Sequence, residues 1–300
     1  MKCGVVDIGS NTIRLSIYHC EGRSFKLLLN KKEMAGLAGY VKGGVLSSDG
    51  IQVACRVLEG FQALLANFGI TELRVFATAS LRNIANTEEA LEAIRQATGI
   101  RAEVLSGAEE ARLSFLGASL GGGAPTGLMA DVGGGSTELV SYEDGHVTSS
   151  CSLPVGSLSL FSRYVDGLFP TAEERRRIRA AVEAELDKAA PLDVRHRHLV
   201  GVGGTFRAAR KLCNDLSGVD PDNPVIPAGE IRGLYRKLKK GDKTTLRQIL
   251  KSTPDRVHTI LPGLVVLHCI LKRYQVETVS VSACGVREGY LFDRVLRNRD

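Results

Sequence analysis

Two short stretches in different halves of the chain repeat one pattern, residues 7–12 (DIGSNT) and residues 131–137 (DVGGGST). In each, an apolar run that predicts a buried strand ends at an aspartate, and a glycine turn follows. Glycine permits tight turns whose backbone N–H groups point at an anion. An aspartate at the strand end offers the hard oxygen ligand that Mg²⁺ prefers. The repetition therefore predicts two loops that grip phosphate and a divalent cation from two sides.

The residues that these loops would use can be stated directly. Phosphate donors would come from Gly9, Ser10, Asn11 and Thr12 in the first loop and from Gly133, Gly134, Gly135 and Ser136 in the second. Asp7 and Asp131 would bind the cation, directly or through water. One Asp-Gly turn alone is common in structural loops, but two at matching places favour a functional site.

The length and composition predict a globular protein of two domains. The chain has 300 residues with ordinary apolar and charged fractions, which is enough for two substantial cores. Its start lacks the basic and apolar pattern of a secretory signal, and its longest apolar run, residues 260–271, is too short to span a bilayer. Seven cysteines are scattered without CxxC spacing and are expected to be reduced core residues. We expect a cytoplasmic protein that does not bind membranes.

The order of predicted elements repeats along the chain. Residues 1–121 predict three strands, a helix, a strand, a helix, a strand and a helix, and residues 122–300 restart this order with additional helices. The predicted strands span residues 4–7, 12–19, 25–30, 73–77, 102–105, 127–132, 137–143, 146–154, 198–202 and 277–282. The predicted helices span residues 49–67, 87–97, 108–120, 171–188, 203–214, 228–240, 243–251, 255–273 and 286–297. The glycine-rich residues 117–127 are the expected boundary and hinge.

Three further positions have both a functional and a structural interpretation. Glu110 lies in the first turn of a predicted helix. An acid there either stabilises the helix through its interaction with the helix dipole or acts as a general base. Glu138 begins the return strand and would either contact the metal and water or face solvent. Arg82 follows a strand end, where it would either fork onto a phosphate or remain a surface residue.

Residues 201–205 (GVGGT) form a third glycine turn ahead of a basic helix. Gly204 and Thr205 would bind an anion at the helix N-terminus, although a close crossing of strand and helix would also require glycine.

Positive charge is concentrated in residues 205–251, which contain eleven Lys and Arg against five Asp and Glu. The segment is either a solvated helical surface or a binding surface for a polyanion. Nucleic acid is a weaker interpretation, because Phe206 and Tyr235 are the only aromatic residues there to stack on bases.

Eight motifs together resemble the exopolyphosphatase and guanosine pentaphosphate phosphohydrolase family, within the superfamily of actin, sugar kinases and heat-shock ATPases. They are DIGSNTIRL (7–15), ATASLRNIAN (77–86), VLSGAEEARL (104–113), DVGGGSTEL (131–139), PVGS (154–157), GVGGTFRA (201–208), ILPG (260–263) and GVREGYL (285–291). The resemblance implies an α/β fold of two ribonuclease-H-like domains with mixed sheets and an interdomain cleft. It also implies that the last helix packs back on the first domain.

The resemblance further implies roles and a reaction. Glu110 would be the base that activates water, Asp131 and Glu138 would position water and Mg²⁺ or another divalent cation such as Mn²⁺, and the loops with Arg82 would bind terminal phosphates. The implied reaction releases orthophosphate from inorganic polyphosphate or from guanosine pentaphosphate. A kinase or a non-catalytic sensor of polyphosphate or guanosine tetraphosphate is less favoured, and a homodimer is left open.

Two departures from the family pattern are visible. Residues 256–258 (RVH) stand where members often carry Arg-Ala-Asp, so His258 replaces an aspartate. The chain also ends without the helical extension of longer members, which implies a short form that prefers shorter chains.

Overall fold

Each half of the chain builds a mixed β-sheet, and the two sheets share one strand order. The computed structural model describes residues 1–122, 124–189 and 195–297. Two compact units are present: the first comprises Met1–Leu113 with Val286–Asp300, and the second comprises Ser114–Gly285. The division falls inside helix α4 (Gly107–Ser119). The glycine-rich residues 117–127, where a hinge is predicted, follow in the second unit, and residue 123 among them lies outside the described residues.

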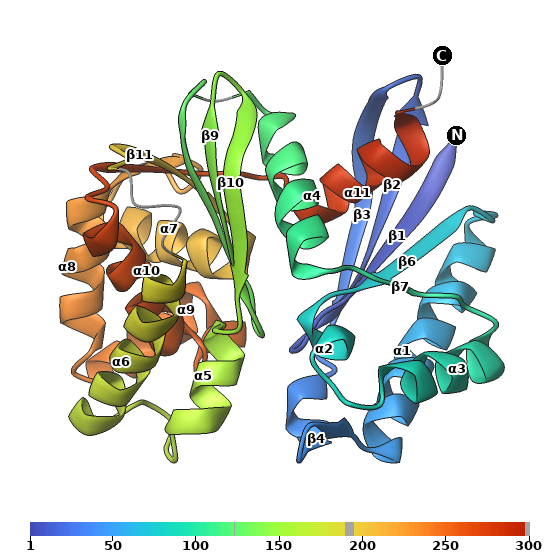
Figure 1. Ribbon diagram of the computed structural model, residues 1–300, viewed down its shortest axis with the longest axis horizontal. Coiled ribbons are helices and arrows are strands. Elements are labelled where there is room, and N and C mark those ends of the chain that lie inside the picture. The colour runs from blue at the N-terminus through green and yellow to red at the C-terminus, as the bar shows by residue number, and fades with distance from the viewer. Residues whose placement is uncertain (123, 190–194, 298–300) are drawn as a thin grey trace. The chain divides into compact units, whose positions relative to one another are not determined.

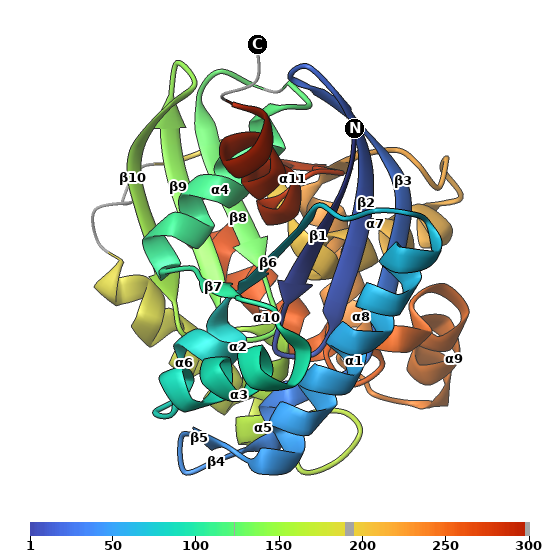
Figure 2. The ribbon, with the colours of Figure 1, turned by 90° about the vertical axis from the view of Figure 1, so that its right-hand side faces the viewer.

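The first unit contains a five-stranded sheet of order β3-β2-β1-β6-β7. Its strands are β1 (Lys2–Ile8), β2 (Ile13–Glu21), β3 (Ser24–Glu33), β6 (Leu73–Ala77) and β7 (Glu103–Val104). Strands β1 to β3 pair antiparallel and lie side by side in Figure 2, whereas β6 is parallel to β1. Its helices include α1 (Ser48–Asn67), α2 (Ala79–Arg82) and α3 (Thr87–Thr98).

The predicted helical spacing in α1 is confirmed. Ile51, Leu58, Phe61 and Leu65 are all buried on one face, and Ser47 caps the helix by accepting a hydrogen bond from the backbone of Gly50. An apolar stripe at this period packs a helix on a core.

The second unit repeats this arrangement in a six-stranded sheet of order β10-β9-β8-β11-β13-β12. Its strands are β8 (Gly127–Val132), β9 (Thr137–Glu143), β10 (His146–Leu153), β11 (His198–Val202), β12 (Val225–Pro227) and β13 (Thr278–Val281). The first five strands of each sheet follow the same order, as expected for an internal duplication. The α/β class with mixed sheets is confirmed.

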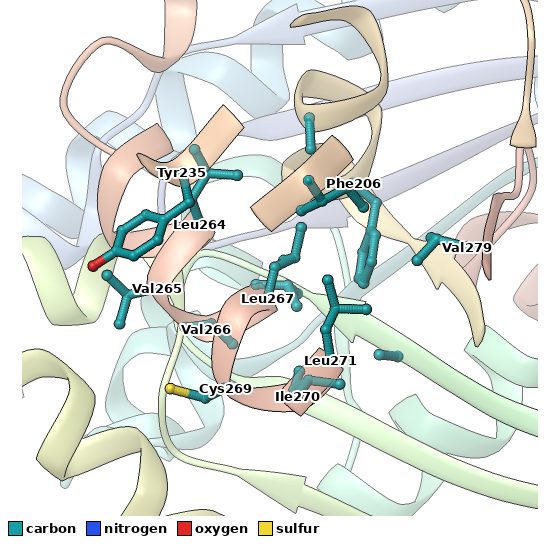
Figure 3. Packing of buried hydrophobic residues seen from close by; sticks show 14 of the residues in the cluster. Phe206, Tyr235, Leu264, Val265, Val266, Leu267, Cys269, Ile270, Leu271 and Val279 are labelled. Carbon is teal, nitrogen blue, oxygen red and sulfur yellow. The ribbon is translucent and has the colours of Figure 1, made fainter. Parts of the chain in front are cut away.

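Helices fill one side of the second sheet. They are α5 (Ser157–Tyr164), α6 (Ala172–Lys188), α7 (Gly203–Ser217), α8 (Ala228–Leu238), α9 (Lys243–Ser252) and α10 (Ile260–Arg273). Figure 1 shows α6, α7, α8 and α10 on the same side of β9 and β10. Helix α10 is buried almost throughout and packs against α5, α6, α7 and α8. Figure 3 shows its apolar side chains, Leu264 to Leu267 and Cys269 to Leu271, in the core with Phe206 and Val279.

The apolar run at residues 260–271 is therefore a core helix. Across the three described ranges, no helix is both long enough and apolar enough to cross a membrane. All seven cysteines are free thiols, and burial raises the pKa of Cys213 and Cys269 to about 12.

Several short elements differ from the predictions. The hairpin β4 (Val41–Lys42) and β5 (Val45–Leu46), helix α2 and strand β12 were not expected. Helix α10 begins at Ile260 instead of residue 255, because a separate 3₁₀ turn at Pro254–Arg256 precedes it. Proline favours the start of a turn of helix and cannot continue one.

The C-terminal segment returns to the first sheet. Helix α11 (Val286–Leu291) and a π-helical turn (Phe292–Leu296) belong to the first unit. Tyr18 on β2 donates a 2.5 Å hydrogen bond to Glu288, and Arg287 donates one of 2.7 Å to Ser16. These buried polar contacts fix the helix on the sheet, because an unpaired polar group at the same depth would cost free energy.

Candidate active site

The two Asp-Gly loops are built on the same hydrogen bond. The N–H of Gly9 donates to the carbonyl of Thr12 over 3.1 Å, and the N–H of Gly133 donates to the carbonyl of Ser136 over 3.0 Å. A Cβ at Gly9 would lie 2.9 Å from the Thr12 carbonyl oxygen. The backbone N–H groups of these two glycines therefore hold the turns, and the predicted binding of phosphate by the two loops stays a prediction.

The carbonyls of both loops hold neighbouring segments. Gly134 accepts hydrogen bonds from the backbone N–H groups of Leu158 and Ser159 in the first turn of α5, each over 2.9 Å. Ser10 accepts from Ala38 over 3.0 Å in the first unit. The first N–H groups of a helix lack partners within the helix. The Gly134 carbonyl therefore gives two N–H groups of α5 a partner and also anchors its own loop to that helix.

Asp131 and Glu138 stand directly opposite each other on the antiparallel strands β8 and β9. Asp131 is 9% exposed and Glu138 is 1% exposed. Ser114 donates to Oδ2 of Asp131 over 2.5 Å, and Ser152 donates to Oε1 of Glu138 over 2.8 Å. Side chains directly opposite on adjacent strands lie on one face, where like charges are destabilising. A buried pair of acids in this register is a candidate position for a cation.

The first unit differs at the equivalent register. Opposite Asp7 on β1 stands Arg14 on β2. This register places an acid against a base, while the second unit places two acids together. The duplicated sheets thus differ in the charges that they pair at this register.

The donor set is compatible with magnesium. Within the described ranges, no group of three or more His, Cys, Asp or Glu side chains converges as a metal site would. Mg²⁺ is commonly bound by one or two carboxylates together with water and substrate phosphates. Asp131 and Glu138 fit that pattern.

Glu110 and Arg82 form a buried ion pair in the first unit. Nη1 of Arg82 lies 2.6 Å from Oε2 of Glu110 and also donates to the Leu105 carbonyl over 3.0 Å. Glu110 is 8% exposed in the first turn of α4, where the Ser106 side chain accepts a hydrogen bond of 3.2 Å from the backbone N–H of Glu109. A guanidinium that donates to both groups fixes the carboxylate. The predicted contact of Arg82 with phosphate stays a prediction.

The third glycine turn is shaped by two side chains. Gly203 has a φ of +88°, and a Cβ there would lie 2.3 Å from Oδ1 of Asp131. A Cβ at Gly204 would lie 1.8 Å from Nη2 of Arg256. Glycine is required at both positions because a carboxylate and a guanidinium approach the backbone closely.

The hydroxyl of Thr205 is bonded within the protein. It donates to the Val132 carbonyl over 3.0 Å, and the residue is 1% exposed. The Thr205 side chain therefore joins α7 to β8. The anion-binding role of Gly204 and Thr205 stays a prediction, and the first backbone N–H groups of α7 are the donors available for it.

Comparison with known proteins identifies the family. A family model described as the Ppx/GppA phosphatase family matches residues 16–298. The chain belongs to this family. The resemblance predicted from the motifs is thereby confirmed, as is the prediction of a hydrolytic enzyme.

Relatives in the Ppx/GppA family cover nearly the whole chain. Exopolyphosphatase 1 of Mycobacterium tuberculosis is 25% identical, with 98% of this chain and 88% of that protein aligned. The Photobacterium profundum protein named guanosine-5'-triphosphate,3'-diphosphate pyrophosphatase is 25% identical, with 98% of this chain and 59% of that protein aligned. The crystal structure of the Aquifex aeolicus family member has a TM-score of 0.79 at 28% identity, covering 100% of this chain and 99% of that one.

Sequence reasoning missed three residues around the site of this Ppx/GppA protein: Ser114, Ser152 and Arg256. Ser114 lies four residues after Glu110 and hence on the same face of α4, a spacing that was available in the sequence. Ser152 stands opposite Glu138 across the hairpin of β9 and β10, and no spacing signal relates Arg256 to Gly204. His258, the departure from the family pattern, packs against the ring of Phe161 at 5.3 Å, and burial followed by the nearby Arg256 charge lowers its pKa.

Proposed function

We propose that the protein is an exopolyphosphatase, which hydrolyses the terminal phosphoanhydride bond of inorganic polyphosphate. The observation that carries the proposal is Glu110, a buried carboxylate oriented by Arg82. The name of the M. tuberculosis relative supports the substrate. A general base needs a fixed position within reach of the proton that it accepts.

The reaction follows from the roles of the side chains. The remaining N–H and hydroxyl groups of the two loops, at Ser10 to Thr12 and Gly134 to Ser136, bind the oxygens of the terminal phosphate. Glu110 accepts a proton from water as its oxygen bonds to the terminal phosphorus. The bridging P–O bond breaks, its electron pair stays with the departing chain, and orthophosphate is released. Preorganised donors of this kind stabilise the charge that develops in the transition state.

The acidic residues would hold the divalent cation. Asp131 and Glu138 are the proposed ligands, Mg²⁺ or Mn²⁺ is the proposed ion, and Asp7 is proposed to act through water. When bound, the cation would neutralise phosphate charge. Ser114 and Ser152 orient the two carboxylates, and Glu138 is also proposed to orient the attacking water.

The decisive experiment compares two neighbouring glutamates. Orthophosphate release from polyphosphate with Mg²⁺ is measured for the wild type, Glu110→Gln and Glu109→Gln. Glu109 pairs with Arg112 and Arg294, so its variant controls for loss of one acid from the same turn. We expect kcat to fall about 10³-fold for Glu110→Gln, in the range of a lost general base, and little for Glu109→Gln. Equal rates for the two variants would refute the role of Glu110.

Guanosine pentaphosphate is the second candidate substrate. The name of the P. profundum relative supports it, although the chain spans 59% of that protein. The same assay with guanosine pentaphosphate compares kcat/KM for the two substrates, and the larger value identifies the preferred one. Tight binding of either compound by calorimetry without phosphate release would instead indicate a sensor.

A further inference from the structure

A cationic segment of the second unit is not used by the proposed reaction. Residues 236–251 contain seven Lys and Arg and one acid, Asp242. Asp242 caps α9, where its side chain accepts a hydrogen bond of 2.8 Å from the backbone of Thr245. The positive charge of this segment is therefore largely uncompensated within its own sequence.

Three of these charges form a stripe on α9. Lys243, Arg247 and Lys251 are exposed and follow one another at four-residue intervals, so they lie along one face of the helix. The buried residues of α9 are Thr245, Ile249 and Ser252. At 100° per residue, the two sets occupy opposite sides. The basic stripe, defined as Lys243, Arg247 and Lys251, thus faces away from the core.

The basic stripe does not stabilise its helix. Like charges four residues apart on a helix repel each other, and Lys243 in the first turn opposes the helix dipole, whereas Lys251 in the last turn is favoured by it. Within the part of the chain that the structure describes, none of the three side chains forms an ion pair or a side-chain hydrogen bond. Three exposed cations with no internal partner among the described side chains are available to an external anion.

The stripe leads toward the acidic pair along the chain of the second unit. Helix α9 packs against the 3₁₀ turn that carries Arg256. The Arg256 guanidinium lies against the backbone of Gly204, and the preceding Gly203 lies against the Asp131 carboxylate. Arg256, five residues after Lys251 and next to the acidic Asp255, thus places a further cation at the N-terminus of α7, whose first N–H groups favour an anion.

We infer that the basic stripe binds internal phosphates of a linear polyphosphate whose end is being hydrolysed. This inference rests on the proposed function and refines its substrate. From Lys243 to Lys251 the helix rises about 12 Å, a length that only a chain of several phosphates spans. The phosphates of guanosine pentaphosphate are divided between two ends of a nucleoside and cannot follow such a stripe. The protein therefore favours the polymer over the nucleotide.

The test removes the stripe and compares substrates of different length. The triple variant Lys243→Gln, Arg247→Gln, Lys251→Gln is assayed with tripolyphosphate and with long-chain polyphosphate. We expect the ratio of KM for the long chain to KM for tripolyphosphate to rise about tenfold, and more at low ionic strength than at high, because exposed charges are screened by salt. A matched control variant removes the same number of positive charges from exposed positions in the first unit, with the substitutions Lys2→Gln, Arg23→Gln and Lys26→Gln. It should leave the KM ratio as in the wild type.

A binding measurement separates this inference from the proposed function. Calorimetry with long-chain polyphosphate on Glu110→Gln, with and without the triple substitution, requires no turnover. Weaker binding in the stripe variant supports the inference even if hydrolysis is not observed. An equal KM ratio in the stripe and control variants, or polyphosphate binding that the triple substitution leaves unchanged, would overturn it.

Discussion

The hydroxyl of Ser114 donates a hydrogen bond of 2.5 Å to Oδ2 of Asp131. Ser114 lies one turn after Glu110 on the continuous helix α4, so a single helix carries the proposed base and the group that orients a proposed metal ligand. Hydrogen bonds to charged groups contribute about 1.5–3 kcal/mol. Ser114 is therefore a positioning residue for the Asp131 carboxylate.

Replacing Ser114 by alanine tests that role. Because Asp131 loses the donor that fixes it, we expect the Mg²⁺ concentration for half-maximal phosphate release to rise about tenfold. The matched variant is Ser119→Ala, which removes an exposed hydroxyl that donates to the Phe115 carbonyl on the same helix. Identical Mg²⁺ titrations for the two variants would show that Ser114 does not position Asp131.

Arg82→Ala tests the buried ion pair through stability. Removing one partner leaves the Glu110 charge buried without its guanidinium, which costs about 3 kcal/mol or more. The comparison is Arg95→Ala, whose pair with Glu92 has the same 2.6 Å separation but exposed side chains. That substitution should cost far less, because solvent screens an exposed pair. Urea unfolding gives both values. Adding Glu110→Gln to Arg82→Ala should recover part of the loss, and a cycle without coupling would argue against the pair.

Much of the fold could be predicted because it depends on local patterns. The spacing of Ile51, Leu58 and Leu65 predicted α1, and the capping box of Thr171 and Glu174 predicted the start of α6, where both hydrogen bonds are present. Such signals involve residues within one or two turns of each other. They predict whether a long segment is a helix or a strand, but very short elements contain too few residues to show such a signal. The two-residue strands β4 and β5 were therefore missed.

The site was predictable in its acids and less so in its contacts. Asp131 and Glu138 follow from the motif, and their opposition across a turn follows from the short hairpin between them. The use of Thr205 could not be predicted, because a hydroxyl at a helix start binds either an anion or a nearby carbonyl. In the structure the Thr205 hydroxyl donates to the carbonyl of Val132, which lies 73 residues away in sequence.

Histidine burial predicts a loss of stability in mild acid. Burial lowers the pKa of His268, and the charges of Arg179, Arg232 and Lys272 lower it further, while Glu183 opposes them. The unfolded chain, with an ordinary histidine pKa near 6.5, then binds the proton more readily than the folded protein. Stability is therefore full above that pH and falls as pH drops below it.

The measurement is the free energy of unfolding in urea at pH 7.5 and 5.5. We expect the wild type to lose stability between these values and His268→Gln to lose less. His146→Gln, at an exposed position of β10, should behave as the wild type. A slope in His268→Gln as steep as that of the wild type would contradict this origin of the pH dependence.

Gly203→Ala should disable the site through a single methyl group. The added Cβ would lie 2.3 Å from Oδ1 of Asp131, and the residue has a φ of +88°. The carboxylate has to move, so we expect the rate of phosphate release to fall about 100-fold or more, as 1 Å displacements in active sites do. Gly218→Ala separates displacement from strain, because Gly218 has a φ of +65° and no atom near its Cβ position. Gly218→Ala should lose only about 1 kcal/mol of stability and keep its activity. Equal losses of activity in Gly203→Ala and Gly218→Ala would show that backbone strain, and not displacement of Asp131, causes the effect.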